Sequence, residues 1–134
     1  MISRNAFKDC DKSIEINIPS SVKKIERFAF SGCRNLKTVS FGDDSNLISL
    51  GGSVFSDCTN IKEIVLPSAL QKIGSYAFNN CTNIEEVSFP ASVEKIEGFV
   101  FYGCTNLSKV SYFFETIVSS DFLEGTQNVV VEVK

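Results

Sequence analysis

Cysteines are the residues of this 134-residue chain with the clearest capacity for chemistry. Their thiolates bind zinc, form disulfides and act as nucleophiles. The sequence contains five, at Cys10, Cys33, Cys58, Cys81 and Cys104. Zinc ribbons need close pairs such as C-x-x-C, whereas here no two cysteines are closer than 23 residues. We therefore predict buried free thiols that fill an apolar interior, with a disulfide between two of them as the alternative.

Other residue types offer little for catalysis or metal binding. The chain has no histidine, which removes Ser-His and Cys-His pairs, histidine metal sites and the usual general base. We therefore predict that it is not an enzyme and needs no metal or cofactor. Asp43 and Asp44 resemble half of a calcium site but lack the D-x-D-x-D-G pattern, so a solvated insertion is the preferred interpretation. Of two glycosylation sequons, at Asn80 and Asn106, the first is predicted to be the exposed one.

Composition and charge narrow the class of protein. Hydrophobic residues make up 43% of the chain and charged residues 22%, which is typical of a folded globular domain. A net charge of −3 with dispersed lysines and arginines argues against nucleic acid or an anionic membrane surface as the main partner. No apolar run approaches the roughly 18 residues of a membrane-spanning helix. The N-terminus lacks the apolar core of a signal peptide, so we expect an intracellular protein or, preferably, a trimmed portion of a longer one.

A repeat of about 23 residues places the cysteines. Each Cys follows a Phe by three positions, and the phenylalanines are Phe7, Phe30, Phe55, Phe78 and Phe101. Four of the cysteines are followed two positions later by an asparagine: Asn35, Asn60, Asn83 and Asn106. The consensus is (A/V)F-x-x-C-x-N-(L/I)-x-x-(V/I)-x-(F/L)-P-x-x-(V/L)-x-x-I. So short a unit cannot bury its apolar face alone, and stacking about five of them predicts a solenoid.

Local patterns predict the elements of each coil. Apolar residues two apart, such as Ile64 and Leu66, predict a short half-buried strand that the following Pro ends. The "LQKI" type of segment predicts a second short strand on another side, and "SYAFNNC" one helical or 3-10 turn. Stacking coils about 4.8 Å apart would form structural ladders of Phe, Cys and Asn. We expect the Asn side chains to point inward and bond to buried turn backbone.

The consensus resembles that of the BspA-like leucine-rich repeats, a 23-residue class found in bacteria and mucosal protists. The resemblance covers roughly residues 6–112. It implies a right-handed leucine-rich-repeat solenoid with a short-stranded sheet on one face. It also implies a surface-exposed or secreted protein that binds other proteins, in some members components of the extracellular matrix or of the host-cell surface.

The chain reads as one solenoid domain, residues 1–134. Residues 1–28 form an atypical first coil, in which Ser13 replaces the usual Leu or Ile, and residues 29–112 form the regular repeats. Residues 113–134 form a degenerate C-terminal coil or cap that ends in "VVVEV". Because an open solenoid end exposes strand edges, end-to-end self-association is also predicted.

The outward positions of the main strands are the candidate protein-binding face, since rigid solenoid faces are where repeat proteins bind. They are Lys37, Thr38, Ser40, Lys62, Glu63, Val65, Glu85, Glu86, Ser88, Ser108, Lys109 and Ser111. A second row, Lys24, Lys72 and Lys95 with Glu94 beside it, is interpreted as a solvated edge. These features predict a non-enzymatic protein-binding module of a surface or secreted adhesin-like protein. A structural spacer in a larger surface protein and an intracellular adaptor are the alternatives.

Overall fold

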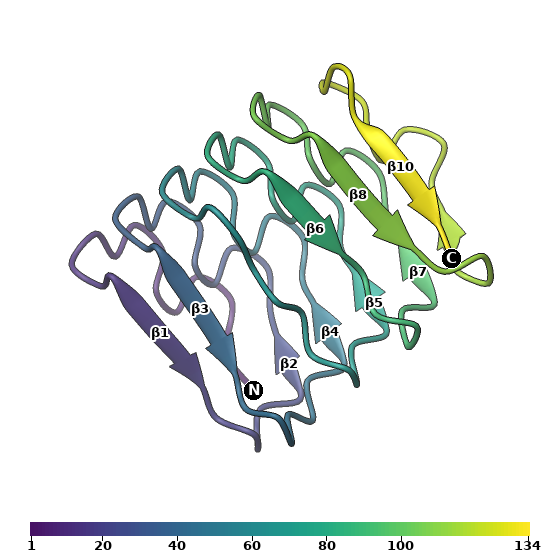
Figure 1. The fold of residues 1–134 in the computed structure, drawn as a ribbon. Coiled ribbons are helices and arrows are strands. Elements are labelled where there is room, and N and C mark those ends of the chain that lie inside the picture. Colours follow the sequence, from purple (N-terminus) through teal and green to yellow (C-terminus); the bar gives the residue numbers. More distant parts are fainter.

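Short parallel strands wind into a β-solenoid of about five turns (Figure 1). The computed structural model describes all residues, 1–134. The strands are β1 (Glu15–Ile18), β2 (Lys24–Ile25), β3 (Thr38–Phe41), β4 (Ser49–Leu50), β5 (Lys72–Ile73), β6 (Glu86–Ser88), β7 (Lys95–Ile96), β8 (Lys109–Tyr112), β9 (Ile117–Val118) and β10 (Val130–Val133). The chain contains no helix, and therefore none that could cross a membrane. The predicted β-rich solenoid with short strands is confirmed.

The strands line two faces of the coil. We call the face formed by β1, β3, β6, β8 and β10 the main face, and the one formed by β2, β4, β5, β7 and β9 the second face. All pairs are parallel, and equivalent residues of successive coils face each other, as Val87 faces Val110 and Ile73 faces Ile96. This register follows from the repeat, because each strand presents its apolar residues to the interior at the same positions.

The turn around each recurring Phe differs from the prediction. Helical or 3-10 turns were expected, whereas the structure has runs of tight turns. The reason is that each of the first five coils places two residues at positive φ, which a right-handed helix cannot include. One precedes the Cys and is always Asp, Asn or Gly, the residue types that adopt this conformation most readily. These residues are Asp9, Gly32, Asp57, Asn80 and Gly103.

Phenylalanine rings form the central ladder of the interior. From Phe7 to Phe101, consecutive rings stack with centroids 5.2 to 5.7 Å apart and ring planes within 12° of parallel. Offset stacking at this separation is a favourable arrangement for aromatic pairs and adds to the burial of their surface. Phe30, Phe55, Phe78 and Phe101 are completely buried, while Phe7, at the open end of the first coil, is 46% exposed.

Cysteine thiols link the coils beside this ladder. Each of Cys33, Cys58, Cys81 and Cys104 donates its S–H to the Phe carbonyl of the coil before it, at 2.9 to 3.2 Å. The four are buried, Cys10 is half-buried, and none forms a disulfide. A small side chain with a weak donor therefore occupies a slot that contains a backbone acceptor.

The asparagine positions do not lie where the sequence suggested. Asn35, Asn83 and Asn106 are exposed and Asn60 is half-buried, so the expectation of an inward Asn ladder is wrong. Asn35 donates from Nδ2 to the carbonyl of Asp11, at 2.6 Å, and thus bonds to turn backbone from the outside. The apolar residue that follows each Asn, such as Leu36, is the one that turns inward.

The two faces differ in continuity. The second face is one sheet in the order β2-β4-β5-β7-β9, whereas the main face divides into β1-β3 and β6-β8-β10. Between them, residues 61–66 of the third coil form only an isolated bridge, from Glu63 to Glu86. Figure 1 shows this teal segment running without an arrow between β3 and β6. None of the backbone N–H groups of residues 62–66 donates to another backbone group.

Candidate protein-interaction face

The predicted binding positions lie together on the outward side of the main face. Eleven of the twelve are exposed, among them Lys62, Glu63, Val65 and Glu86. Ser111 is the exception, because it is only 2% exposed and its hydroxyl has no hydrogen-bond partner. Ser111 is therefore removed from the candidate contact residues, although its register partner Ser88 remains exposed.

Two ion pairs lie on the main face. Lys62 pairs with Glu85 at 3.9 Å and Lys109 pairs with Glu132 at 3.1 Å. The hydrogen bond between Lys109 and Glu132, reinforced by their opposite charges, raises the pKa of the lysine and lowers that of the carboxyl. Glu132 was not among the predicted positions, although the alternation in "VVVEV" is the signal that could have identified it as outward-facing.

Glu63 and Glu86, on the same face, are glutamates that form no ion pair. They are partners in the isolated bridge, so two glutamates occupy facing positions on adjacent coils, and Glu86 also faces Lys109 on β8. Like charges directly opposite each other on neighbouring strands are unfavourable, and a positively charged group from a partner would relieve that repulsion.

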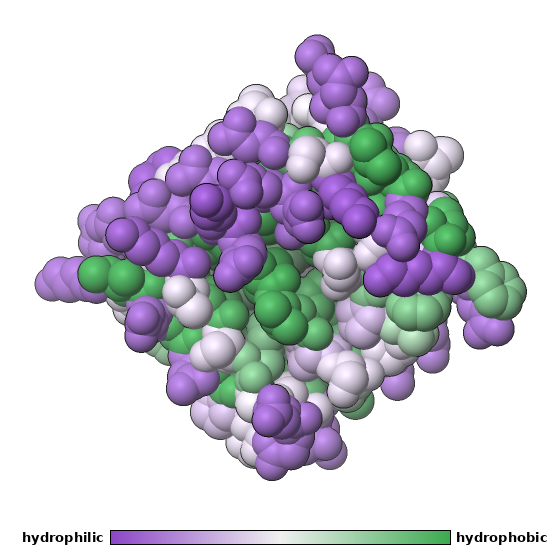
Figure 2. Space-filling model, viewed as in Figure 1, coloured by the Kyte–Doolittle hydropathy of each residue, from purple (hydrophilic) through white to green (hydrophobic).

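A groove of about 380 Å³ opens on the main face beside these carboxylates. The third coil contributes Val65 and Leu66 to its lining, and the following coil contributes Ser88, Phe89 and Pro90. Its lining residues are Glu63, Ile64, Val65, Leu66, Glu86, Ser88, Phe89, Pro90, Phe113 and Lys134. Figure 2 shows hydrophobic residues gathered over the middle of this face and along β10, with hydrophilic residues over the N-terminal parts of β3, β6 and β8.

Phe113 and Lys134, which the sequence did not identify, also line the groove. Phe113 follows β8, and the ammonium group of Lys134 lies 5.8 Å from the centroid of its ring. Both belong to the region predicted as a degenerate cap, where the repeat pattern no longer indicates which side chains face outward. Val65, which also lines the groove, is 81% exposed and is the most accessible large hydrophobic residue of the chain.

This arrangement can bind a polypeptide but offers little for catalysis. The lining of the groove combines apolar side chains, two carboxylates and a lysine with unpaired backbone N–H groups along the third coil. Extended peptides are recognised by such combinations of backbone donors and side-chain pockets.

Buried thiols and the exposed carboxylates of Asp43 and Asp44 lie outside the groove. Burial raises the pKa of Cys104 to about 12 and that of Cys81 well above its usual value, so both remain protonated near neutral pH. Protonated thiols are poor nucleophiles and poor metal ligands. Asp43 and Asp44 lie exposed, and no third His, Cys, Asp or Glu completes a metal-binding group with them. The side chain of Asn80 is exposed and donates to Asp57 at 3.0 Å.

Comparison with known proteins identifies the repeat. The BspA-type leucine-rich repeat region matches residues 1–129, in six copies. The chain belongs to the BspA-type leucine-rich repeat family. No curated protein sequence matches this BspA-type chain.

Solved structures share the fold of this BspA-type chain. The leucine-rich repeat protein of T. pallidum superimposes with a TM-score of 0.84 at 30% identity, over 97% of this chain and 60% of that one. The pneumococcal vaccine antigen PcpA gives 0.83 at 30% identity, over 90% of this chain and 30% of that one. A leucine-rich cell surface protein of Faecalibacterium prausnitzii gives 0.83 at 21% identity, over 91% and 32%, which shows the fold alone. The chain thus spans less than two thirds of each of these structures.

Proposed function

We propose that the chain is a non-enzymatic protein-binding module of a surface or secreted adhesin-like protein, and that the main-face groove is its contact site. The groove carries the proposal, because it joins exposed apolar walls, unpaired carboxylates and unpaired backbone donors in one place. Membership of the BspA-type family and the likeness to a vaccine antigen support a surface location. The ligand would be a protein of the extracellular matrix or of a host-cell surface.

The partner segment expected from the groove is an extended peptide with a basic residue next to an apolar one. Its basic side chain would lie between Glu63 and Glu86, and its apolar side chain between Val65 and Phe113. Hot spots of protein interfaces are buried side chains of this kind surrounded by a polar rim. The exposed Lys62 and Glu85 pair would lie in that rim and contribute mainly to the rate of association.

The test is binding of the purified chain to an immobilised panel of extracellular-matrix and epithelial surface proteins. Val65→Lys should weaken saturable binding by about tenfold or more, which corresponds to about 1.4 kcal/mol. The matched control is Ile117→Lys, because Ile117 is an equally apolar residue, 67% exposed, on the second face. A triple charge reversal at Lys62, Glu85 and Glu86 should also weaken binding, through loss of the charge pattern beside the groove.

Two results would contradict the proposal. Equal loss of binding in the Val65 and Ile117 variants would remove the groove from the contact site, and no binding to any protein of the panel would favour a spacer or an intracellular adaptor. Self-association has to be measured first, because β10 leaves a strand edge with exposed Val130 and Val133 at the end of the sheet. Sedimentation over a range of concentrations separates end-to-end assembly from binding to a different protein.

A further inference from the structure

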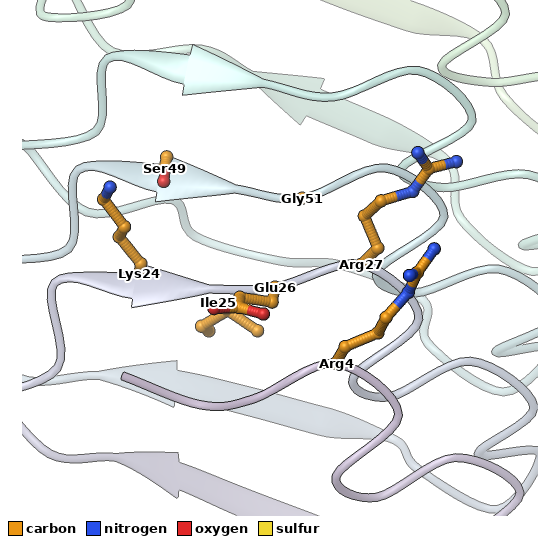
Figure 3. Close-up of a pocket in the computed structure, with 7 residues that line it drawn as sticks. All are labelled: Arg4, Lys24, Ile25, Glu26, Arg27, Ser49 and Gly51. Atoms are coloured by element: carbon orange, nitrogen blue, oxygen red, sulfur yellow. The ribbon is translucent and has the colours of Figure 1, made fainter.

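A basic cleft lies on the second face at its N-terminal end, away from the main-face groove. It has a volume of about 330 Å³, and its polar lining comes from Arg4, Lys24, Glu26, Arg27 and Ser49. Figure 3 shows the side chains of Arg4 and Arg27 extending in the same direction from successive coils, with Lys24 toward the other end of the cleft. The sequence separates these three cations, but the winding of the chain brings them together.

The repeat explains why the two arginines are neighbours. Arg4 and Arg27 stand at equivalent positions of the first and second coils, and the N–H of Asn5 donates to the carbonyl of Arg27 at 3.2 Å. The guanidinium of Arg27 also lies 5.7 Å from the centroid of the Phe28 ring, a cation–π distance. Successive coils are about 4.8 Å apart, so the two arginine side chains can reach a single ligand.

The cations of the cleft have no carboxylate partner. Every ion pair of the structure lies elsewhere, and none involves Arg4, Lys24 or Arg27. Glu26 is the one acidic residue among the lining residues, and it forms no ion pair with any of them. Three positive charges against one negative charge leave the cleft with a net positive potential, and that potential favours an anion.

The third coil leaves the cleft open. At the positions that follow Glu26 and Arg27 by one coil it has Gly51 and Gly52, so neither of these positions places a side chain over the arginine. A Cβ added at Gly51 would lie 2.6 Å from the backbone nitrogen of Arg27, which shows how closely the two backbones approach. A Cβ at Gly52 would lie 3.6 Å from Nε of Arg27, so this part of the guanidinium rests against bare backbone.

We propose that this cleft binds a sulfate or phosphate ester group carried by a small polar molecule such as a sugar. Arginine presents a planar fork of N–H donors that matches such oxyanions, and two forks with a lysine and the Ser49 hydroxyl can surround one of them. The volume exceeds what a single oxyanion needs, which leaves room for the body to which the ester is attached. The site is separate from the main-face groove, so each proposal can fail without the other.

The test is isothermal titration calorimetry of the full chain with a sulfated disaccharide, a sugar phosphate, inorganic sulfate and inorganic phosphate. Arg4→Gln and Arg27→Gln should each weaken ester binding about tenfold, since one charged hydrogen-bonding partner is lost in each. Lys72→Gln is the matched control, because Lys72 is an exposed cation of the same face that does not line the cleft. Tighter binding of the sulfated sugar than of the sugar phosphate, or the reverse, identifies the source of the oxyanion.

A third substitution, checked for folding, tests whether loss of binding comes from the cleft itself rather than from unfolding. Ser49→Asp places a carboxylate inside the cleft at a half-buried strand position and should also abolish ester binding, while circular dichroism verifies that each variant is folded. Equal weakening by Lys72→Gln would show diffuse attraction to the whole face and overturn the proposal. No heat of binding for either ester at millimolar concentration would overturn it as well.

Discussion

The two faces of this solenoid come from the same repeat but differ in how their strands pair. The second face is an unbroken sheet of five strands, each only two residues long. The main face has longer strands but is interrupted at the third coil. The third coil nevertheless keeps its place in the stack, because the ring of Phe55 lies 5.6 and 5.7 Å from those of Phe30 and Phe78. The interior therefore holds the coils together, and a face can lose pairing without loss of the fold.

The interruption lies next to the only insertion among the cysteine spacings. Two extra residues fall within "GDDSNL", residues 42–47, directly after β3. The second face regains its register at once, since Ser49 pairs with Lys72. On the main face the next coil is left without pairing to β3, and residues of this coil line the groove. The two-residue insertion thus directly precedes the coil whose residues line the main-face groove.

The largest effect on stability is expected from removing a buried side chain of the interior that both faces share. Phe78 is completely buried, with stacked neighbours 5.7 Å away on both sides, so Phe78→Ala should lower the free energy of unfolding by about 3–5 kcal/mol. Phe7→Ala is the control, because Phe7 is 46% exposed and stacks on one side only. Urea unfolding of the two variants checks the difference. Equal losses would mean that the ladder does not carry the stability of the stack.

A smaller effect should distinguish the tight second face from the looser edge of the main face. A Cβ at Gly74 would lie 2.5 Å from the backbone nitrogen of Gly52, so Gly74→Ala forces two coils apart and should cost about 1–3 kcal/mol. At Gly42, in the loop after β3, the nearest atom is a side-chain oxygen of Asp44 at 3.0 Å, which can move away. Gly42→Ala should therefore change stability by less than about 0.5 kcal/mol. Thermal unfolding measures both, and a reversed order would contradict the difference in packing.

Much of the fold could be predicted because it repeats. The spacing of Phe78 and Cys81 from their equivalents, and the alternation at Ile64 and Leu66, indicated the coil, its strands and its inward positions. The Asn positions were misjudged because a recurring polar residue fits an exposed turn as well as a buried one. The turn conformation was missed because positive φ at residues such as Tyr76 is not a preference of that residue type.

The two candidate sites were harder to predict than the fold. The exposed strand positions followed from alternation, but the groove depends on a missing pairing and on Phe113, which lies outside the regular repeats. The basic cleft was hidden because dispersed charges in the sequence become neighbours when they occupy equivalent positions, as Arg4 and Arg27 do. A net charge of −3 therefore says little about the local potential on a solenoid.

The smallest effect concerns the carboxylates at the interruption itself. Glu63→Gln removes one of two like charges that face each other across the isolated bridge, and it should raise stability by about 0.2–1 kcal/mol at low salt. The gain should fade in about 1 M NaCl, where the Debye length falls to roughly 3 Å. The control Glu132→Gln should shift stability in the opposite direction, because it removes the partner of Lys109.

Urea unfolding at low and high salt measures both variants. Amide exchange at Glu85, whose N–H donates to the carbonyl of Lys62 at 3.2 Å, reports directly on the contact between the third coil and β6. If charge repulsion helps keep the third coil apart from β6, Glu63→Gln slows that exchange as it adds stability. A variant that is less stable at low salt would mean that Glu63 supports the bridge rather than strains it. The open pairing of the main face would then follow from the backbone and its insertion alone, and the groove would not depend on its charges.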